Sequence, residues 1–382
     1  MKWLQWAGLP VGIAILIALI VRDGAADVMH VIGAAGPALL WLVPFHALPL
    51  VLDAHAWRLL LDRRVSLAFL WWAATVREAV SRLLPVAGIG GEIVGIRLAR
   101  WKHDDASVVS ASVIVEVLVT IAVQYAFSAL GLVLIVAATG ESGVLRTVGL
   151  ALLLSLPVPV VLAVLLRRGG LFHAIERWAA RLLGASHPLL QGIDGGRLDA
   201  DIDALMSRTG LLLRAFLWQL GGYMAGAFET WWALQLLGHP VSVGGALAIE
   251  ALTQAVRHAA FMVPAGLGVQ EAAVVLLAQL FGVDHQVALS LALVKRVREV
   301  IFGCLALLSW QAVELARGRR YLPRAARDGY DTGDDGVDGG VDGGTRRRAP
   351  AKPKVSAKPS GVPSVAKSAP ASRPPDAHDR IH

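Results

Sequence analysis

Long apolar runs separated by short arginine clusters are the feature of this sequence that most restricts its fold. Hydrophobic residues fill 55% of the 382 positions, charged residues fill 17%, and the mean hydropathy is +0.59. Several runs reach about 20 residues, enough for one helix to cross a bilayer core. Inside that core the backbone N–H and C=O groups must pair within the chain, and helices achieve this within a single run. The sequence therefore predicts an all-α polytopic membrane protein.

The pattern of these runs predicts about six full spans. Basic residues follow several of them, such as Arg63 and Arg64 after the second, and mark the cytoplasmic side by the positive-inside rule. We therefore expect both chain termini in the cytoplasm. An alternative interpretation of the first run is a cleaved signal peptide. A retained span is favoured, because no convincing small-residue cleavage site precedes Arg22. The six runs cover residues 3–21, 38–61, 107–138, 144–166, 211–237 and 287–315.

Two further apolar stretches are interrupted by proline and glycine. Residues 83–92 and 261–271 each contain a Pro, then two Gly separated by one residue, then a Glu seven positions after the Pro. Proline and glycine both interrupt helices. We therefore predict two broken helical hairpins. The predicted helix breaks comprise Pro85, Gly88, Gly90, Gly91, Pro264, Gly266 and Gly268.

Positive-inside logic gives the two hairpins opposite orientations. Basic residues at 97–103 place both ends of the first hairpin inside, whereas the second enters from the outside after the turn at 238–240. Opposite halves with broken helices at the centre form an inverted-topology repeat, and in transporters the substrate site lies where such halves meet.

Ionisable residues lie inside these apolar stretches, where they are costly and usually functional. Glu78 and Arg82 are four residues apart on one helix face, so we expect them to pair, and Lys295 is expected to pair with Glu299 in the same way. One interpretation is that these are buried pairs that only hold helices together. The favoured interpretation is a polar substrate path lined by Arg77, Glu78, Arg82, Glu92, Glu116, Glu250, Arg257, Glu271, Lys295, Arg296 and Glu299.

Outside the spans, two segments are polar. Residues 169–208 predict an amphipathic helix that lies on the inner leaflet or, with equal weight, packs on other cytoplasmic segments, and then a short helix with Asp199, Asp201 and Asp203 on its wet side. Residues 1–320 would form the membrane domain. Residues 328–382 are rich in Gly, Asp, Lys, Pro and Ser, which predicts a disordered cytoplasmic tail.

Several function classes lack their motifs. The chain has no P-loop, zinc helix or nucleophile elbow, its histidines are scattered, and Cys304 is its single cysteine. We therefore expect no metal, no cofactor, no catalytic residues and no enzymatic activity. The net charge of +7 comes largely from arginines beside the membrane and from the tail, which indicates lipid headgroups rather than nucleic acid as partners.

Three stretches, at 77–100, 254–281 and 289–311, together resemble the flippase-like membrane family. That family shares its fold with the transmembrane half of lysylphosphatidylglycerol synthases, and the resemblance is greatest to members associated with hopanoid biosynthesis. It implies a bacterial inner-membrane protein that moves a hopanoid or a lipid with an anionic or polar headgroup. Aminoacyl transfer is not expected, because only the tail follows residue 315.

The leading hypothesis, a lipid transporter, gives roles to particular residues. Arg77, Arg82 and Arg257 would contact the headgroup, and Glu92 and Glu271 would orient it or carry a coupling proton. One rival hypothesis is a non-transporting scaffold for lipid-biosynthetic proteins. An intramembrane lipid-modifying enzyme is disfavoured, because no nucleophile or metal set accompanies the carboxylates.

Overall fold

The computed structural model describes residues 33, 36–84, 90–140, 142–183, 194–259 and 268–321, and every regular element in these ranges is a helix. The chain divides into two units, Met1–Leu322 and Pro323–His382, and the fold described below is that of the first. The predicted span at 3–21 and the predicted tail at 328–382 lie outside the described residues.

The described part of the first half contains two predicted spans, at 38–61 and 107–138, with the first hairpin between them. Its elements are η1 (Pro37–Trp41), α3 (Leu42–Phe45), α4 (Ala47–Leu60), α5 (Leu67–Leu83), α6 (Gly90–Ala99) and α7 (Ala106–Thr139). Local signals set two of these boundaries. The Asp105 side chain accepts hydrogen bonds from the first turn of α7, and Gly140 ends that helix in the left-handed conformation at φ 68°.

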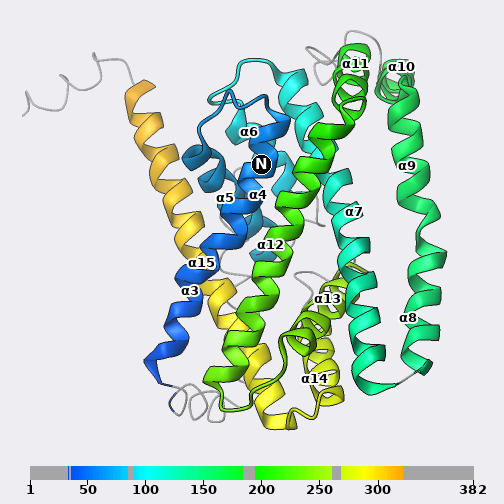
Figure 1. Cartoon of the computed structure of the whole chain (residues 1–382). Helices are drawn as coiled ribbons and strands as arrows, with labels where there is room; N and C mark the ends of the chain where they lie inside the picture. Colours follow the sequence, from blue (N-terminus) through cyan, green and yellow to red (C-terminus); the bar gives the residue numbers. More distant parts are fainter. Residues whose placement is uncertain are drawn as a thin grey trace, which may run out of the picture. The chain divides into compact units, whose positions relative to one another are not determined.

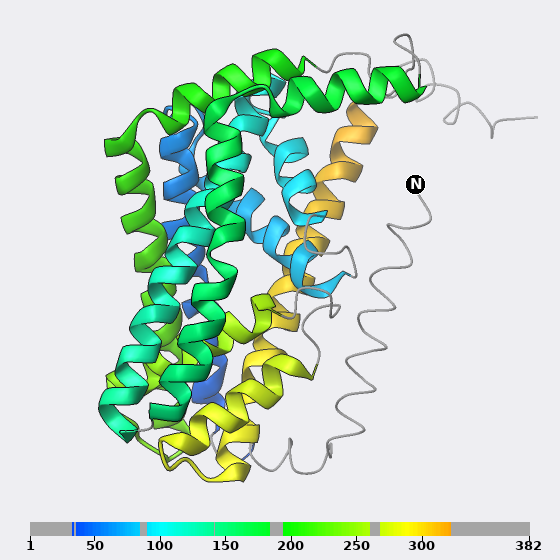
Figure 2. The same ribbon diagram turned by 90° about the vertical axis from the view of Figure 1, so that its right-hand side faces the viewer.

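The connection between the halves is helical and includes a predicted span. Its elements are α8 (Ser142–Ser155), α9 (Pro157–Arg168), α10 (Leu171–Leu183) and α11 (Gly195–Met206). Helices α10 and α11 pack against each other, and α11 also packs on α7 and α9. Figure 2 shows both of them running across one end of the bundle.

The expectation that Asp199 lies on the wet side of its helix is wrong. Its side chain is buried and accepts hydrogen bonds from the backbone N–H groups of Phe172 (3.1 Å) and His173 (3.0 Å). The first N–H groups of a helix have no partner within that helix, so the Asp199 carboxylate satisfies the start of α10. Asp203 is exposed as expected.

The second half contains a long helix, the second hairpin and a further long helix. It comprises α12 (Thr209–Leu236), the hairpin helices α13 (Val243–Ala259) and α14 (Val269–Leu280), and the long helix α15 (His285–Tyr321). In each half, the helices on either side of the predicted break pack against each other, α5 on α6 and α13 on α14. Pro85, Gly88, Pro264 and Gly266 lie outside the described residues, whereas Gly90 begins α6 and Gly268 precedes α14.

Among the residues that the structure describes, three helices are long and apolar enough to cross a membrane by length and composition, namely Pro37–Leu60, Ala106–Ala138 and Arg146–Arg168. They match three of the predicted spans. Helices α12 and α15 are also long, with 28 and 37 residues, but α15 carries a run of charged side chains. The count of about six spans and the inverted repeat stay predictions.

The two halves exchange their packing partners. Helix α5 packs on α15 of the second half, α13 packs on α7 of the first half, and α4 packs on α12 (Figure 1). Glycine permits the close packing of α5 on α15 and of α13 on α7. A Cβ on Gly303 would lie 2.6 Å from Leu83 Cδ1, and one on Gly131 would lie 2.6 Å from Ala251 Cβ. Each hairpin therefore lies against a long helix of the other half.

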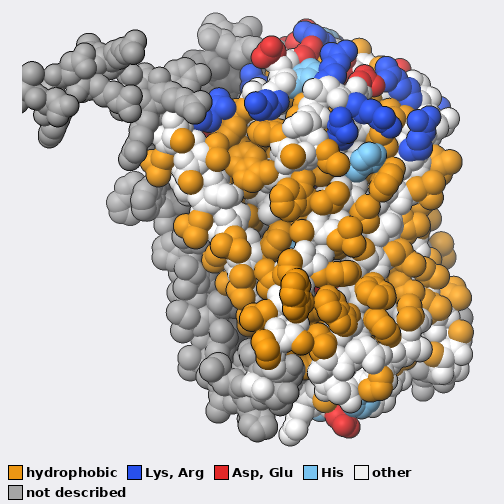
Figure 3. Space-filling view, turned by 60° about the vertical axis from the view of Figure 1, so that its left-hand side comes forward, with side chains coloured by type: hydrophobic (Ala, Val, Ile, Leu, Met, Phe, Trp, Pro, Cys, Tyr) orange, Lys and Arg blue, Asp and Glu red, His pale blue; other side chains and the backbone are white. Residues whose placement is uncertain are grey.

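The surface has a marked distribution of charge. Figure 3 shows a largely hydrophobic face with Lys and Arg side chains gathered towards one end, the end at which Figure 1 shows α10 and α11. Helices α9 to α11 and the start of α12 contribute the exposed residues Arg167, Arg168, Arg177, Arg181, Arg197 and Arg208.

Candidate functional site

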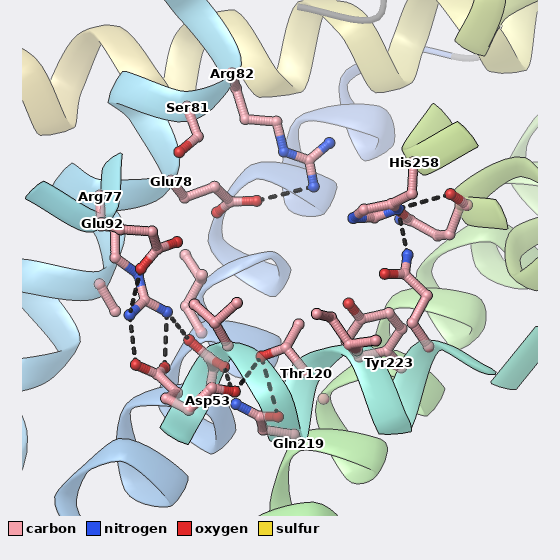
Figure 4. Close-up of a pocket in the computed structure, with 18 of the residues that line it drawn as sticks. Asp53, Arg77, Glu78, Ser81, Arg82, Glu92, Thr120, Gln219, Tyr223 and His258 are labelled. Carbon is pink, nitrogen blue, oxygen red and sulfur yellow. Dashed lines mark hydrogen bonds and ion pairs between the residues drawn. The ribbon is translucent and has the colours of Figure 1, made fainter. Parts of the chain in front are cut away.

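A cavity of about 750 Å³ lies inside the bundle and is lined by residues of both hairpins (Figure 4). The first hairpin contributes residues of α5 and α6, and the second contributes residues of α13 and α14. The cavity brings together nine of the eleven residues of the predicted path, namely Arg77, Glu78, Arg82, Glu92, Glu116, Glu250, Arg257, Lys295 and Glu299. Glu271 and Arg296 are not part of its lining.

Arg77 is the centre of a cluster of three carboxylates. Its guanidinium makes two hydrogen bonds to Glu116, at 2.6 and 2.7 Å, and lies 3.2 Å from Asp53 and 3.5 Å from Glu92. The Glu116 side chain is only 1% exposed. The two parallel bonds fix the planar guanidinium, as is typical of arginine and carboxylate. The cluster joins α4, α5, α6 and α7.

Gly91 permits this arrangement. A Cβ at this position would lie 2.0 Å from Ser81 Oγ and 2.6 Å from the Arg77 carbonyl oxygen. No side chain fits there, so glycine lets α6 approach α5 closely and bring Glu92 to Arg77. The predicted break glycine is thus a packing position at the start of α6.

A second cluster joins α5 to α15. Arg82 lies 3.1 Å from Glu78, which confirms their predicted pairing, and 2.8 Å from Glu299 of α15. The His46 ring lies 3.2 Å from Glu78 and 3.3 Å from Glu229, and Arg298 pairs with Glu229 at 3.1 Å.

The predicted pairing of Lys295 with Glu299 is wrong. The Lys295 ammonium pairs instead with Glu250 of α13 and donates to Thr230 of α12 at 2.8 Å. Glu250 also accepts from Thr230 at 2.6 Å and from Gln254 at 2.9 Å. The spacing of four residues permits a pair within α15, but the Glu299 carboxylate is already occupied by arginines, and Glu250 offers Lys295 a buried carboxylate.

Glu271 makes contacts that hold helices α14 and α15 together. One of its oxygens accepts the backbone N–H of Gly268 at 2.8 Å, and the other accepts from Arg296 Nε at 2.8 Å. It therefore caps the start of α14 and ties that helix to α15. Arg296 also lies 3.2 Å from Glu299. These two residues of the predicted path support the wall of the cavity from behind.

Arg257 differs from the other cations of the cavity. Arg77, Arg82, Lys295 and Arg298 each have a carboxylate within 4.0 Å. Arg257 has no such ion pair with any residue that the structure describes. The same side of the cavity contains Tyr223 and His258, which Figure 4 shows across an open space from Arg77 and Glu92.

Two buried polar atoms of the cavity wall also lack partners. Thr253 Oγ1 and Gln270 Oε1 make no hydrogen bond within the described part of the chain. Thr253 lies four residues before Arg257, so both face the cavity from one side of α13. Buried polar atoms are normally paired, so these positions are suited to contact a polar ligand.

Sequence reasoning missed several lining residues, namely His46, Asp53, Gln219, Tyr223 and Thr253. Asp53 had a usable signal, because it is an acidic residue inside an apolar run predicted to span the membrane. Uncharged residue types such as Gln, Tyr and Thr occur in many helices, so Gln219, Tyr223 and Thr253 gave no such signal. No group of three or more His, Cys, Asp or Glu suited to a metal ion occurs in the described residues.

Apolar spanning helices around a charged interior define a multi-pass helical membrane protein. The family model for the lysylphosphatidylglycerol synthase TM region matches residues 5–306, and the chain belongs to this family. Membership indicates a membrane protein of lipid metabolism. No curated protein and no solved structure matches the chain.

Proposed function

We propose that this protein is a lipid transporter of the bacterial inner membrane and that the cavity receives the headgroup of the lipid. The cavity supports this proposal because its polar lining comes from both hairpins, at the place where transporters with inverted repeats bind substrate. No covalent change of the lipid is part of the proposal. The resemblance to hopanoid-associated members makes a hopanoid one candidate cargo.

The headgroup contacts differ from those first expected. Arg77 and Arg82 would have to give up carboxylate partners in order to bind a ligand. Arg257 has no carboxylate partner to give up among the described residues, and Thr253 offers a hydroxyl one turn away. We therefore assign the headgroup contact to Arg257 and Thr253, and assign Arg77 and Arg82 to holding the helices around it.

The direction of insertion follows from charge. The arginine-rich end that carries α10 and α11 would face the cytoplasm, where basic residues are favoured and anionic headgroups attract them. With the predicted spans this gives two cytoplasmic termini and hairpins that enter from opposite sides.

Lipid translocation in vesicles tests the proposal. Purified protein would be reconstituted with a labelled phospholipid or hopanoid, and the accessibility of the label in each leaflet would be followed over time. We expect Arg257→Gln to slow translocation by about tenfold, equivalent to about 1.4 kcal/mol in the barrier. Arg208→Gln is the matched control, because Arg208 is exposed and pairs with Asp62 at the surface.

Two outcomes would contradict the proposal. If folded wild-type protein moved none of these lipids, the scaffold for lipid-biosynthetic proteins would become the better interpretation. If Arg257→Gln and Arg208→Gln behaved alike, transport would not depend on the Arg257 side of the cavity.

A further inference from the structure

One side of the cavity is apolar. Helices α6, α7, α9 and α10 contribute lining residues there that carry no charge, among them Ile93, Ile96, Ile121, Leu162, Leu166 and Ile175. The cavity thus has two chemically different parts, a charged one between the hairpins and a hydrocarbon-lined one beside α7. A lipid has the same two parts.

The apolar part reaches the surface of the bundle. Ile93 is 63% exposed and Ile175 is 51% exposed, although both line the cavity, and Leu162 is also exposed. Exposed apolar side chains are costly in water but match the hydrocarbon of a bilayer. The surface around this opening is therefore suited to lipid rather than to water.

The helix pair beside the opening has few neighbours. The span Arg146–Arg168 comprises α9 and most of α8, and none of its most apolar 18-residue window is buried within the chain. Helix α9 leads into α10, which lies across the end of the bundle (Figure 2). The apolar wall of the opening is thus made by helices whose outer faces contact the membrane itself.

The rim of the opening is basic. Arg167 and Arg168 end α9 and are exposed, and Arg177 and Arg181 are exposed on α10. Phosphate groups of anionic lipids lie at the depth where such side chains end, and each basic residue near an anionic surface contributes about 1 kcal/mol of attraction. The basic rim and the apolar lining therefore both suit an anionic lipid that approaches the opening from this leaflet.

We propose that the apolar side of the cavity, lined by α6, α7, α9 and α10, is a lateral entrance for the hydrocarbon part of a membrane lipid. The lipid enters from the leaflet at the arginine-rich end. Its chains lie along α7 past Ile121, and its headgroup reaches the charged part of the cavity. This inference rests on the proposed function but makes its own claim about the route.

Photocrosslinking measures occupancy of the entrance without any substitution. Wild-type protein in nanodiscs would contain a phosphatidylglycerol with a diazirine in its acyl chain, and adducts would be mapped by proteolysis and mass spectrometry. We expect adducts at Ile121, on the inner wall, as well as at the exposed Leu154 of α8. The buried Val274 and Leu291 should carry none. Adducts restricted to outer faces such as Leu154 would overturn the proposal.

Blocking the entrance tests its use in transport. In a Cys304→Ser background, Leu162→Cys would be coupled to a long-chain alkyl thiosulfonate, which fills the apolar lining. We expect this modification to slow translocation by about tenfold, equivalent to about 1.4 kcal/mol. The matched control is Val158→Cys, which lies one turn earlier in α9, is exposed and does not line the cavity.

The two experiments separate the entrance from the proposed function. Equal translocation by both modified variants would refute the entrance while leaving transport intact. Adducts at Ile121 without translocation of any lipid by unmodified protein would retain the entrance and refute the transporter.

Discussion

Replacing Arg77 by Gln tests whether the charged clusters hold the bundle together. Glutamine keeps a polar, though shorter, side chain and removes the cation that the described part of the chain places among three carboxylates, Asp53, Glu92 and Glu116. Glu116 is then the most affected, because its side chain is 1% exposed and both of its oxygens lose a hydrogen bond from Arg77.

The expected loss is large for one substitution. Removing one partner of a buried ion pair costs about 3–5 kcal/mol, because the other charge stays buried without compensation. We therefore expect Arg77→Gln to lower the free energy of unfolding by about that amount. Adding Glu116→Gln should recover at least about 1 kcal/mol, because the two residues are directly coupled. Asp53 and Glu92 are partly exposed and contribute less to the remaining cost.

The assay is denaturant-induced unfolding in mixed micelles, followed by tryptophan fluorescence. Arg97→Gln is the matched control, because Arg97 pairs with Glu314 at 2.7 Å on an exposed surface. Such surface pairs contribute about 0–1 kcal/mol. Equal losses for Arg77→Gln and Arg97→Gln would refute the reasoning, and so would a double variant as unstable as the sum of its two single substitutions.

Three further predictions concern packing, capping and pairing. Gly303→Val should lower the free energy of unfolding by about 1–3 kcal/mol in the same titration, because a Cβ there lies 2.6 Å from Leu83 Cδ1. Asp199→Ala should speed amide hydrogen exchange at the start of α10 by about fivefold, because a lost cap costs about 1 kcal/mol. Lys295→Met should destabilise by about 3–5 kcal/mol and be partly rescued by Glu250→Gln, again measured by unfolding.

Two of these predictions have a control in the chain, and the third has an outcome that would contradict it. Gly210 has no atom within 4 Å of an added Cβ, so Gly210→Val should cost much less than Gly303→Val. Asp203 is exposed on the same helix as Asp199, so Asp203→Ala should leave exchange in α10 unchanged. If Lys295→Met left the free energy of unfolding unchanged, the ion pair between Lys295 and Glu250 would not contribute to stability, and the prediction would be wrong.

The helices around the breaks were predictable because their causes are local. Proline and glycine interrupt a helix through their own backbone chemistry, and the flanking apolar residues form helices of the expected length. The pairing of Glu78 with Arg82 was also local, because residues four apart share a helix face.

The partners across the bundle were not predictable, because sequence spacing carries no information about them. Lys295 meets Glu250, 45 residues away, and Arg82 meets Glu299, 217 residues away. Asp199 is polar in a polar helix, and only the folded chain shows that the first turn of α10 lies over it. The local pattern predicted that the residues of both ion pairs are charged and lie inside the membrane. Their contacts depend on how the helices of the two halves pack against each other.

The charged residues have two interpretations, as structural ion pairs or as a substrate path. The geometry favours the first for most of these residues and leaves the second open for Arg257. Glu271 and Arg296 lie behind the wall, and Arg77, Arg82 and Lys295 are joined to carboxylates that link neighbouring helices. These pairs keep a charged chamber open inside an apolar bundle. Arg257 alone among the described lining arginines and lysines has no carboxylate within 4.0 Å, and this is why the proposed headgroup contact is placed there and not at the paired cations.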